Sequence, residues 1–344
     1  MFNKIYEFFK KILKENYKTL IFTIVFCLIA TYPVPYYIYT SGGISDLNDK
    51  IEIENGYIQN GSYNLSYVTE IEGNILTYLA GRVIPSWDIV EMSDYQISST
   101  ENIEDIAIRD RLSLLQANQT AIMLAYEKAG KPITINKTNL YIVYLAEYFE
   151  STKEVKIGDL LIKIDKQEIE SFEELVKYID SKEIGDYIEL ELLRGKETIT
   201  TQVKINDIDG KKATGIAIYK IYDYEVTPKI KFKFTIRESG ASAGLMTTLA
   251  IYDALIEEDL TNGLKIAGTG TISDDGTVGE IGGVKYKLKG AETKNADLFF
   301  VPVGNNYEEC LKLKEEKKYD IEIVPVETFD DAISYLKKIK NEKE

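Results

Sequence analysis

The sequence of 344 residues contains no histidine, and this absence excludes more chemistry than any other feature of its composition. Catalytic groups of the Ser-His-Asp and Cys-His types, zinc sites of the HExxH type and histidine-based pH switches all require that side chain. A nucleophilic enzyme encoded here must therefore use another base. Lysine is the natural candidate, because burial disfavours its charged form.

Cysteine is nearly as scarce, and basic residues are outnumbered. Cys27 lies in an apolar run and Cys310 stands alone, which argues against an internal disulfide framework and a thiolate zinc site. The net charge is -15 and no basic stripe is visible, so a nucleic-acid partner is not expected. The sequence has no G-x-x-x-x-G-K-[ST] phosphate loop. We expect no metal, no cofactor and no nucleotide.

The first 45 residues combine a lysine-rich start with a long uncharged run from Thr19 to Ser45. The apolar centre of that run matches the ~20 residues needed to span a hydrocarbon core. The lysines precede it, which predicts a cytoplasmic tail over 1–18, a transmembrane signal anchor over 19–40 and a catalytic part outside the cell membrane. A cleaved signal peptide is the alternative, although no small-x-small site follows the run.

The segment 41–136 is strand-like at first and helical later. Short strand patterns broken by glycines extend from Ile51 to Gln96. Asp105 then suits the start of a long helix, which Gly130 and Pro132 stop. We interpret this helix as a packing element.

Residues 137–207 form a compact unit of a different kind. The pattern predicts a strand, a strand pair turning at Asp165-Lys166, a helix capped by Ser171 and a hairpin turning at Arg194-Gly195. This order resembles a circularly permuted PDZ domain, and the segments "GDLLIKIDKQEI" and "FEELVKYI" carry most of the resemblance.

A PDZ domain adds an extended peptide as a strand beside one helix. The resemblance places that groove between residues 140–146 and 171–179. A PDZ-like spacer without a ligand is the alternative. The peptide-binding residues expected on this basis are Leu140, Tyr141, Ile142 and Val143.

From residue 208 to 344 strands and helices alternate, which predicts a mixed α/β domain. Its first predicted helix follows "SGASAGLM", where Ser242 is either an N-cap or a nucleophile at a helix N-terminus. The helices are expected at 243–258, 284–294, 306–317 and 329–340.

A second segment, "GTGTISDDGTVGEIGGVKYKLKGAE", bears on that choice. Lys287 flanks the apolar stripe of its helix, whereas Lys285 and Lys289 lie on another face, closer to solvent. Lys287 is therefore predicted to be the buried lysine, and a buried amine is a base able to take a proton from Ser242. The stripe itself consists of Val284, Leu288 and Ala291.

Together these motifs resemble the proteolytic domain of the Lon family of serine peptidases, over about residues 231–325. The resemblance implies that Ser242 and Lys287 form a Ser–Lys dyad and that Thr269 hydrogen-bonds the lysine. The family's proline before the serine is Ala241 here, and its acidic residue three before the serine is Ser239. The amides of Ala241 to Ala243 are expected oxyanion donors.

The full arrangement is similar to membrane-anchored, PDZ-containing Lon-like serine proteases. This implies an α/β (α+β) Lon-type domain over 208–344 that packs with segment 41–136, an inserted PDZ domain and one N-terminal transmembrane helix. The expected activity is ATP-independent cleavage of unfolded or extended polypeptides, and a homo-oligomer is compatible with it. A catalytically silent, membrane-tethered PDZ scaffold is the main alternative, and a carboxylate-based hydrolase is a weaker one.

Overall fold

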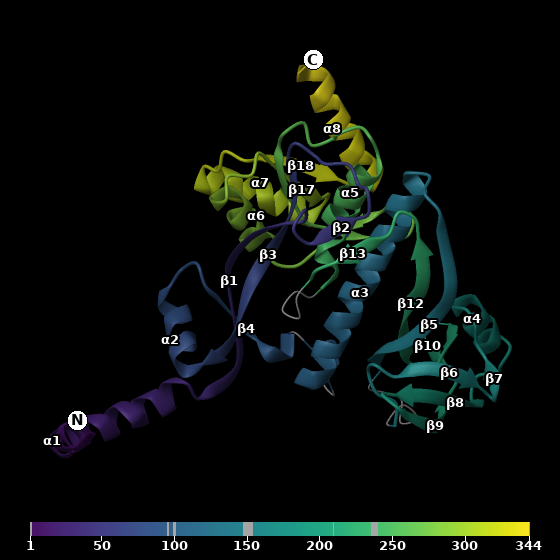
Figure 1. Cartoon of the computed structure of the whole chain (residues 1–344). Helices are drawn as coiled ribbons and strands as arrows, with labels where there is room; N and C mark the ends of the chain where they lie inside the picture. Colours follow the sequence, from purple (N-terminus) through teal and green to yellow (C-terminus); the bar gives the residue numbers. More distant parts are fainter. Residues whose placement is uncertain are drawn as a thin grey trace. The chain divides into compact units, whose positions relative to one another are not determined.

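The structure is a computed structural model that describes residues 2–94, 96–98, 101–146, 154–208, 210–234 and 240–343 (Figure 1). The chain divides into two compact units, residues 1–41 with 68–95, and residues 42–67 with 96–344. Two long strands, β1 (Pro33–Asp46) and β3 (Ser62–Asn74), contribute residues to both units.

The first unit is small and contains little buried apolar surface. Strand β1 pairs antiparallel with β4 (Asp88–Glu91), which is followed by the 3-10 turn η1 (Met92–Asp94). The helix α2 (Ile75–Val83) begins at Asn74, whose side chain accepts a hydrogen bond from the Thr77 N–H, while the Thr77 hydroxyl accepts one from the Asn74 N–H. This reciprocal pair is a capping box, which satisfies donors left open at a helix start.

The structure does not support the predicted transmembrane helix, and no single helix covers 19–40. The helix α1 runs from Phe2 to Ala30 and is followed at Pro33 by strand β1. Its uncharged part, from Thr19 to Ala30, rises only about 18 Å, whereas a hydrocarbon core is ~30 Å thick. Among the described residues, no helix is both long and apolar enough to cross a membrane.

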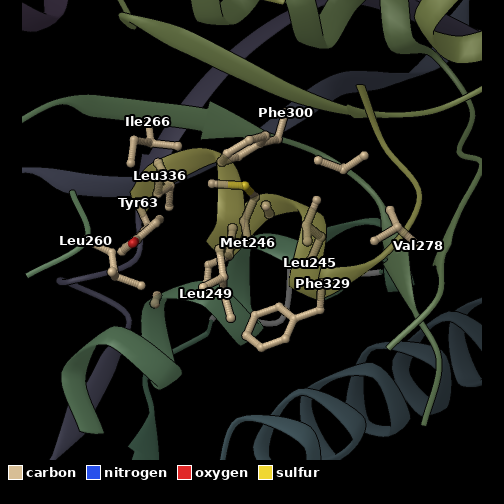
Figure 2. Packing of buried hydrophobic residues seen from close by; sticks show 14 of the residues in the cluster. Tyr63, Leu245, Met246, Leu249, Leu260, Ile266, Val278, Phe300, Phe329 and Leu336 are labelled. Carbon is tan, nitrogen blue, oxygen red and sulfur yellow. The ribbon is translucent and has the colours of Figure 1, made fainter. Parts of the chain in front are cut away.

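The second unit is built on a parallel sheet in the order β18-β17-β14-β3. Its strands alternate cleanly between two faces, as period-2 geometry requires. Ile266 and Phe300 face α5 (Gly244–Leu255) and α8 (Phe329–Lys343), and Figure 2 shows this core. Ala267 and Phe299 face α6 (Val284–Thr293) and α7 (Asn305–Lys317). The remaining strands of the parallel set are β14 (Lys265–Gly268), β17 (Leu298–Pro302) and β18 (Glu322–Val326).

These helices confirm the mixed α/β prediction and lie close to their expected ranges. The predicted buried stripe of α6 is also confirmed, because Val284, Leu288 and Ala291 are at most 1 % exposed. Three short elements complete this part, the turn η3 (Ala241–Ala243) and the paired strands β15 (Thr271–Ile272) and β16 (Val278–Gly279).

Two elements from before the PDZ segment pack into this core. Strand β3 pairs in parallel with β14, and the helix α3 (Ile103–Lys128) contacts α5. Asn102 is the N-cap of α3, so the predicted start at Asp105 is wrong. Asp105 instead lies at the third helical position and accepts from the Asn102 N–H, because the two side chains form a capping box. The strands β2 (Ile51–Ile53) and β13 (Ile230–Phe232) pair antiparallel nearby.

The PDZ segment has its own sheet, in the order β12-β5-β6-β8-β9, and its own apolar core. The predicted turn at Asp165-Lys166 is confirmed, since both residues have positive φ, and so is the Ser171 cap. The elements are β5 (Ile133–Leu145), β6 (Leu160–Ile164), β7 (Gln167–Glu168), α4 (Phe172–Asp180), β8 (Tyr187–Arg194), β9 (Glu197–Lys204), β10 (Asn206–Ile208), β11 (Lys211–Ala213) and β12 (Ile216–Val226).

Candidate active site and peptide groove

Ser242 lies in the middle of η3, the tight turn that leads into α5. Its residue is half-buried. Ala243, not Ser242, is the N-cap of α5, and among the described residues no side chain caps either η3 or α5. The N-cap alternative for Ser242 is therefore wrong. Gly240, with φ of 87°, takes the left-handed backbone that lets the chain enter this turn.

The main chain of Ser242 is fixed by two hydrogen bonds from the loop that follows β14. Its carbonyl oxygen accepts from the Gly270 N–H at 2.9 Å and from the Thr269 hydroxyl at 3.1 Å. The Leu245 N–H in turn donates to the Gly270 carbonyl at 3.1 Å. The turn carrying Ser242 and the loop 269–270 are thus joined in both directions.

Lys287 is buried, with 4 % of its surface exposed, whereas Lys285 and Lys289 are half-buried. The prediction that Lys287 is the desolvated lysine is confirmed. Gly283 precedes α6 in the left-handed conformation, with φ of 68°, and Lys287 follows one turn later. Its Nζ donates a hydrogen bond to the Thr269 Oγ1 at 3.1 Å.

Thr269 connects the two predicted dyad residues. It is fully buried, and its N–H donates to the Phe300 carbonyl, which anchors the loop to β17. Its hydroxyl accepts from Lys287 and donates to the Ser242 carbonyl, so one oxygen serves both partners. The predicted hydrogen bond between Thr269 and Lys287 is confirmed.

Two glycines allow the elements around Ser242 to approach closely. A Cβ on Gly244 would lie 2.8 Å from the Ile272 Cγ2, and one on Gly268 would lie 2.5 Å from the Met246 Sδ. Real Cβ atoms do not approach other atoms this closely, so α5 can pack against β14 and β15 only because both positions lack a side chain. This packing brings Ser242 next to Thr269.

Of the expected oxyanion donors, Ala241 and Ala243 lie in η3 with Ser242 between them. Amides in the first turn of a helix lack intrahelical acceptors and lie at its positive end. The position of these residues is therefore compatible with the role, which stays a prediction. Ser239 lies outside the described residues.

Two other buried titratable groups lie in the same domain. Burial raises the pKa of the Cys310 thiol to about 12, and the nearby Glu309 adds to that effect. Burial also raises the pKa of Asp253, on α5, to about 7, although the Leu260 N–H and the Tyr63 hydroxyl donate to its carboxylate. In the part of the chain that the structure describes, no cluster of three or more acidic or cysteine residues could hold a metal ion.

The predicted peptide-binding strand is wrong. Strand β5, with Leu140, Tyr141, Ile142 and Val143, pairs with β12 along one edge and with β6 along the other. A strand paired on both edges cannot accept a peptide strand at that point. Among the described strands, only β5 pairs with β12, so β12 is the edge strand of this sheet.

The structure instead places an apolar groove between α4 and β12, with a volume of about 300 Å³. Val176 and Ile179 line it from α4, and Ile216 and Ile218 line it from β12. Ile142 is the only one of the four predicted residues that lines this groove. The sequence after Gly215 has the apolar alternation of a strand, which is β12. It does not show which strands are neighbours in the sheet.

Comparison with protein families matches two segments of the chain. Residues 233–338 match the Lon protease (S16) C-terminal proteolytic domain, and residues 133–205 match a PDZ domain. The chain therefore combines a Lon-type proteolytic domain with a PDZ domain, as the sequence motifs predicted. The Lon match contains η3, the loop 269–270 and α6, and the PDZ match contains β5 to β9.

The curated relatives are Lon proteases. One from Metamycoplasma arthritidis is 38 % identical over 106 residues, which is 31 % of this chain and 12 % of that protein. One from Clostridioides difficile is 28 % identical over 203 residues, 54 % of this chain and 25 % of that protein. The chain thus spans well under two thirds of the length of either relative. Among solved structures, the PDZ domain of the SdrC-like protein from Listeria monocytogenes is 25 % identical, with a TM-score of 0.22, over 23 % of this chain and 85 % of that one.

Proposed function

We propose that this protein is a serine endopeptidase that uses Ser242 as nucleophile and Lys287 as base, and that works without ATP. One observation carries the proposal most directly, the chain of hydrogen bonds from the Lys287 Nζ through the Thr269 hydroxyl to the Ser242 carbonyl. The Lon-type domain suggests a serine peptidase, and the absence of histidine leaves lysine as the base. ATP independence rests on the lack of a phosphate-loop sequence in these 344 residues.

In the proposed reaction the Ser242 Oγ attacks a peptide carbonyl carbon while Lys287 accepts the hydroxyl proton. Burial of Lys287 favours this role, because desolvation disfavours a charged amine. Lys287 then returns the proton to the leaving amine, and water hydrolyses the acyl-enzyme. Thr269 holds Lys287 in place, since its hydroxyl is oriented by the bond that it donates to Ser242.

The amides of Ala241 to Ala243 are the proposed donors to the oxyanion of the tetrahedral intermediate. They lie at the N-terminal end of α5, where the helix dipole favours negative charge. The same turn therefore supplies the proposed nucleophile and the N–H groups that would stabilise the tetrahedral intermediate.

The groove beside β12 is proposed to bind an extended segment of the substrate. An open strand edge provides backbone hydrogen bonds, and the apolar lining provides contacts for alternate side chains. Unfolded or extended polypeptides are the substrates that this geometry suits, because strand addition needs a segment that is extended and has unpaired backbone groups.

The test compares Ser242→Ala and Lys287→Met with the matched control Lys289→Met, which removes a half-buried lysine from the same helix. On an unfolded protein substrate we expect both site variants to lose at least 10³-fold in kcat/KM. The control should retain activity close to that of the wild type.

Wild type as inert as Ser242→Ala across pH 7–9 would instead favour a catalytically silent PDZ scaffold. The groove supports this second function, because peptide binding there needs no chemistry at Ser242. Binding of an unfolded protein without cleavage would be its signature.

The location of the catalytic part outside the cell membrane, together with membrane attachment, stays a sequence-based proposal. It can be tested separately from activity, by adding a protease to intact cells and asking whether residues after ~45 are digested. Protection of the whole chain in intact cells would contradict this location.

A further inference from the structure

The helix α3 lies between the peptide groove strand and the turn that carries Ser242. It contacts β12 on one side and both η3 and β15 on the other. Two consecutive residues of α3, Gln119 and Thr120, make specific polar contacts in these two directions. Both are buried to more than nine-tenths of their surface.

Gln119 binds the open edge of β12 as a neighbouring strand would. Its side-chain amide donates to the Tyr222 carbonyl at 2.8 Å, and its side-chain oxygen accepts from the Tyr222 N–H at 2.8 Å. A glutamine used in this way satisfies both backbone groups of one edge residue. It therefore closes the strand edge at Tyr222.

The part of β12 that lines the groove shares this edge. Ile218 and Lys220 precede Tyr222 by even steps, with no register shift between Ile218 and Asp223. Residues separated by two in a strand direct their backbone groups to the same edge. A peptide added beside Ile218 and Lys220 would thus extend along β12 until it meets Gln119.

The next contacts lead from β12 and α3 to the loop before β16. The Lys220 Nζ lies 3.7 Å from the Asp274 Oδ2, and the Thr120 hydroxyl donates to the Asp274 Oδ1 at 3.2 Å. Asp274 therefore contacts the groove strand and α3 together. It lies in a tight turn, in which the Ser273 N–H donates to the Thr277 carbonyl at 3.0 Å.

From Asp274 the path to Ser242 is short. Two residues earlier, Ile272 packs against Gly244, so closely that no side chain fits there. Gly270, two residues before Ile272, donates to the Ser242 carbonyl. A displacement of Asp274 would consequently be transmitted through β15 to the turn that positions the nucleophile.

We propose that Gln119 and Asp274 are positioning residues that couple peptide binding along β12 to the turn that carries Ser242. The proposal rests on the proposed function of this site and groove. A peptide strand that pairs with β12 competes with Gln119 for the edge near Tyr222 and alters the position of Lys220. Tyr222 binds Gln119 of α3, and Lys220 contacts Asp274. A groove occupied by peptide therefore favours a different arrangement of the Ser242 turn than an empty groove does.

The coupling can be measured with a small reporter and a separate groove ligand. The reporter is a tripeptide aminocoumarin amide, which spans only about 10 Å and leaves the groove free. The groove probe is unlabelled β-casein, an unfolded protein, added to the full-length chain. Casein that merely competes for the active site lowers the rate of tripeptide cleavage, whereas casein that acts through the groove raises it.

With wild type we expect saturating casein to raise the tripeptide rate about fivefold or more, the usual lower range for coupled sites. Gln119→Met keeps the length of the side chain and removes both hydrogen bonds, and Asp274→Asn removes the charge that faces Lys220. Each should reduce the stimulation to less than about twofold. The matched controls Gln116→Met on α3 and Asp275→Asn in the same turn should keep the wild-type ratio.

A second readout does not depend on proteolysis. In the Ser242→Ala background, amide hydrogen exchange of residues 240–247 should change when casein binds, and this change should be absent with Gln119→Met. If wild type cleaves neither the tripeptide nor casein, the proposed function fails, and the exchange experiment still decides the coupling.

Three results would overturn the coupling itself. Casein could inhibit wild type without stimulation, or Gln119→Met could keep the full response in both readouts. Loss of casein binding by Gln119→Met would assign Gln119 to ligand binding in place of coupling. Casein affinity is therefore measured by fluorescence anisotropy in the Ser242→Ala background.

Discussion

The Ser242 site and the β12 groove differ in how their polar groups are satisfied by hydrogen bonds. Around Ser242, the Lys287 amine and the Thr269 hydroxyl are buried and hydrogen-bonded to each other. Along β12, backbone groups of Ile218 and Lys220 face an edge with no partner strand among those described. The first arrangement is complete without a ligand, whereas the second leaves bonds for a ligand to make.

Burial accounts for the difference between the two regions. A buried network keeps its geometry because breaking it exposes unsatisfied polar groups at high cost. An open edge keeps its freedom because water satisfies it until a peptide arrives.

The largest effect is expected at Asp253, which holds α5 inside the buried region. Because burial raises its pKa from 3.8 to about 7, the folded protein binds this proton more tightly than the unfolded protein. The resulting stabilisation is complete below pH ~4 and is lost as the pH rises through about 7. We expect Asp253→Asn to gain stability relative to wild type between pH 4 and 8, by roughly 2–4 kcal/mol, in urea unfolding at each pH.

Asp259 is the natural control, because the pKa of its carboxyl is lowered. Burial acts in the opposite direction, but hydrogen bonds from Thr261 and Asn60 outweigh it. Its contribution to stability is present above the unfolded value and is lost in acid. Asp259→Asn should therefore lose stability at pH 8 and converge with wild type in acid, as the pH falls below 3.8 and through the lowered pKa. Parallel pH curves for the two variants would contradict the assignment.

The second effect is expected at Thr269, the connection between Ser242 and Lys287. Thr269→Val keeps the shape of the side chain and removes its hydroxyl, so Lys287 loses one hydrogen bond and the Ser242 turn loses another. We expect a fall in kcat of about 10–100-fold, the range for hydrogen bonds to charged groups. Thr269→Ser should restore most of the rate, and Thr271→Val controls for a threonine lost from the adjacent strand.

The smallest effect is expected in the groove. Val176→Glu places a charge on the apolar, solvent-facing side of α4, where a bound peptide would have to desolvate it. The ratio of KM for an unfolded protein to KM for the tripeptide should rise by about tenfold. Lys177→Gln, on the neighbouring position outside the groove, is the control. An unchanged ratio would show that substrates do not use the groove.

Local patterns were sufficient for much of the fold. The Ser171 cap and the turn at Asp165-Lys166 were predicted, because caps and tight turns depend on neighbouring residues. The burial of Lys287 and its bond to Thr269 were also predicted. Here periodicity pointed to Lys287 and the family resemblance to Thr269.

Other features could not be predicted, because they depend on which distant segments meet. Whether Ser242 caps a helix depends on Gly270 and Thr269, which occupy its carbonyl and set the turn. The peptide groove was assigned to β5, although β5 is paired on both edges and β12 is the edge strand. The uncharged run after Thr19 was long enough as a sequence but is divided between a helix and a strand.

By itself, the sequence determined the chemistry available to this protein. Without histidine, lysine was the candidate base and helical period indicated Lys287, whereas the family resemblance paired it with Ser242. Only the tertiary structure decided which strand edge is open and which residues of α3 bind it. Edge exposure and the Gln119 contacts arise from pairing between segments about 100 residues apart, and such pairing is decided by packing.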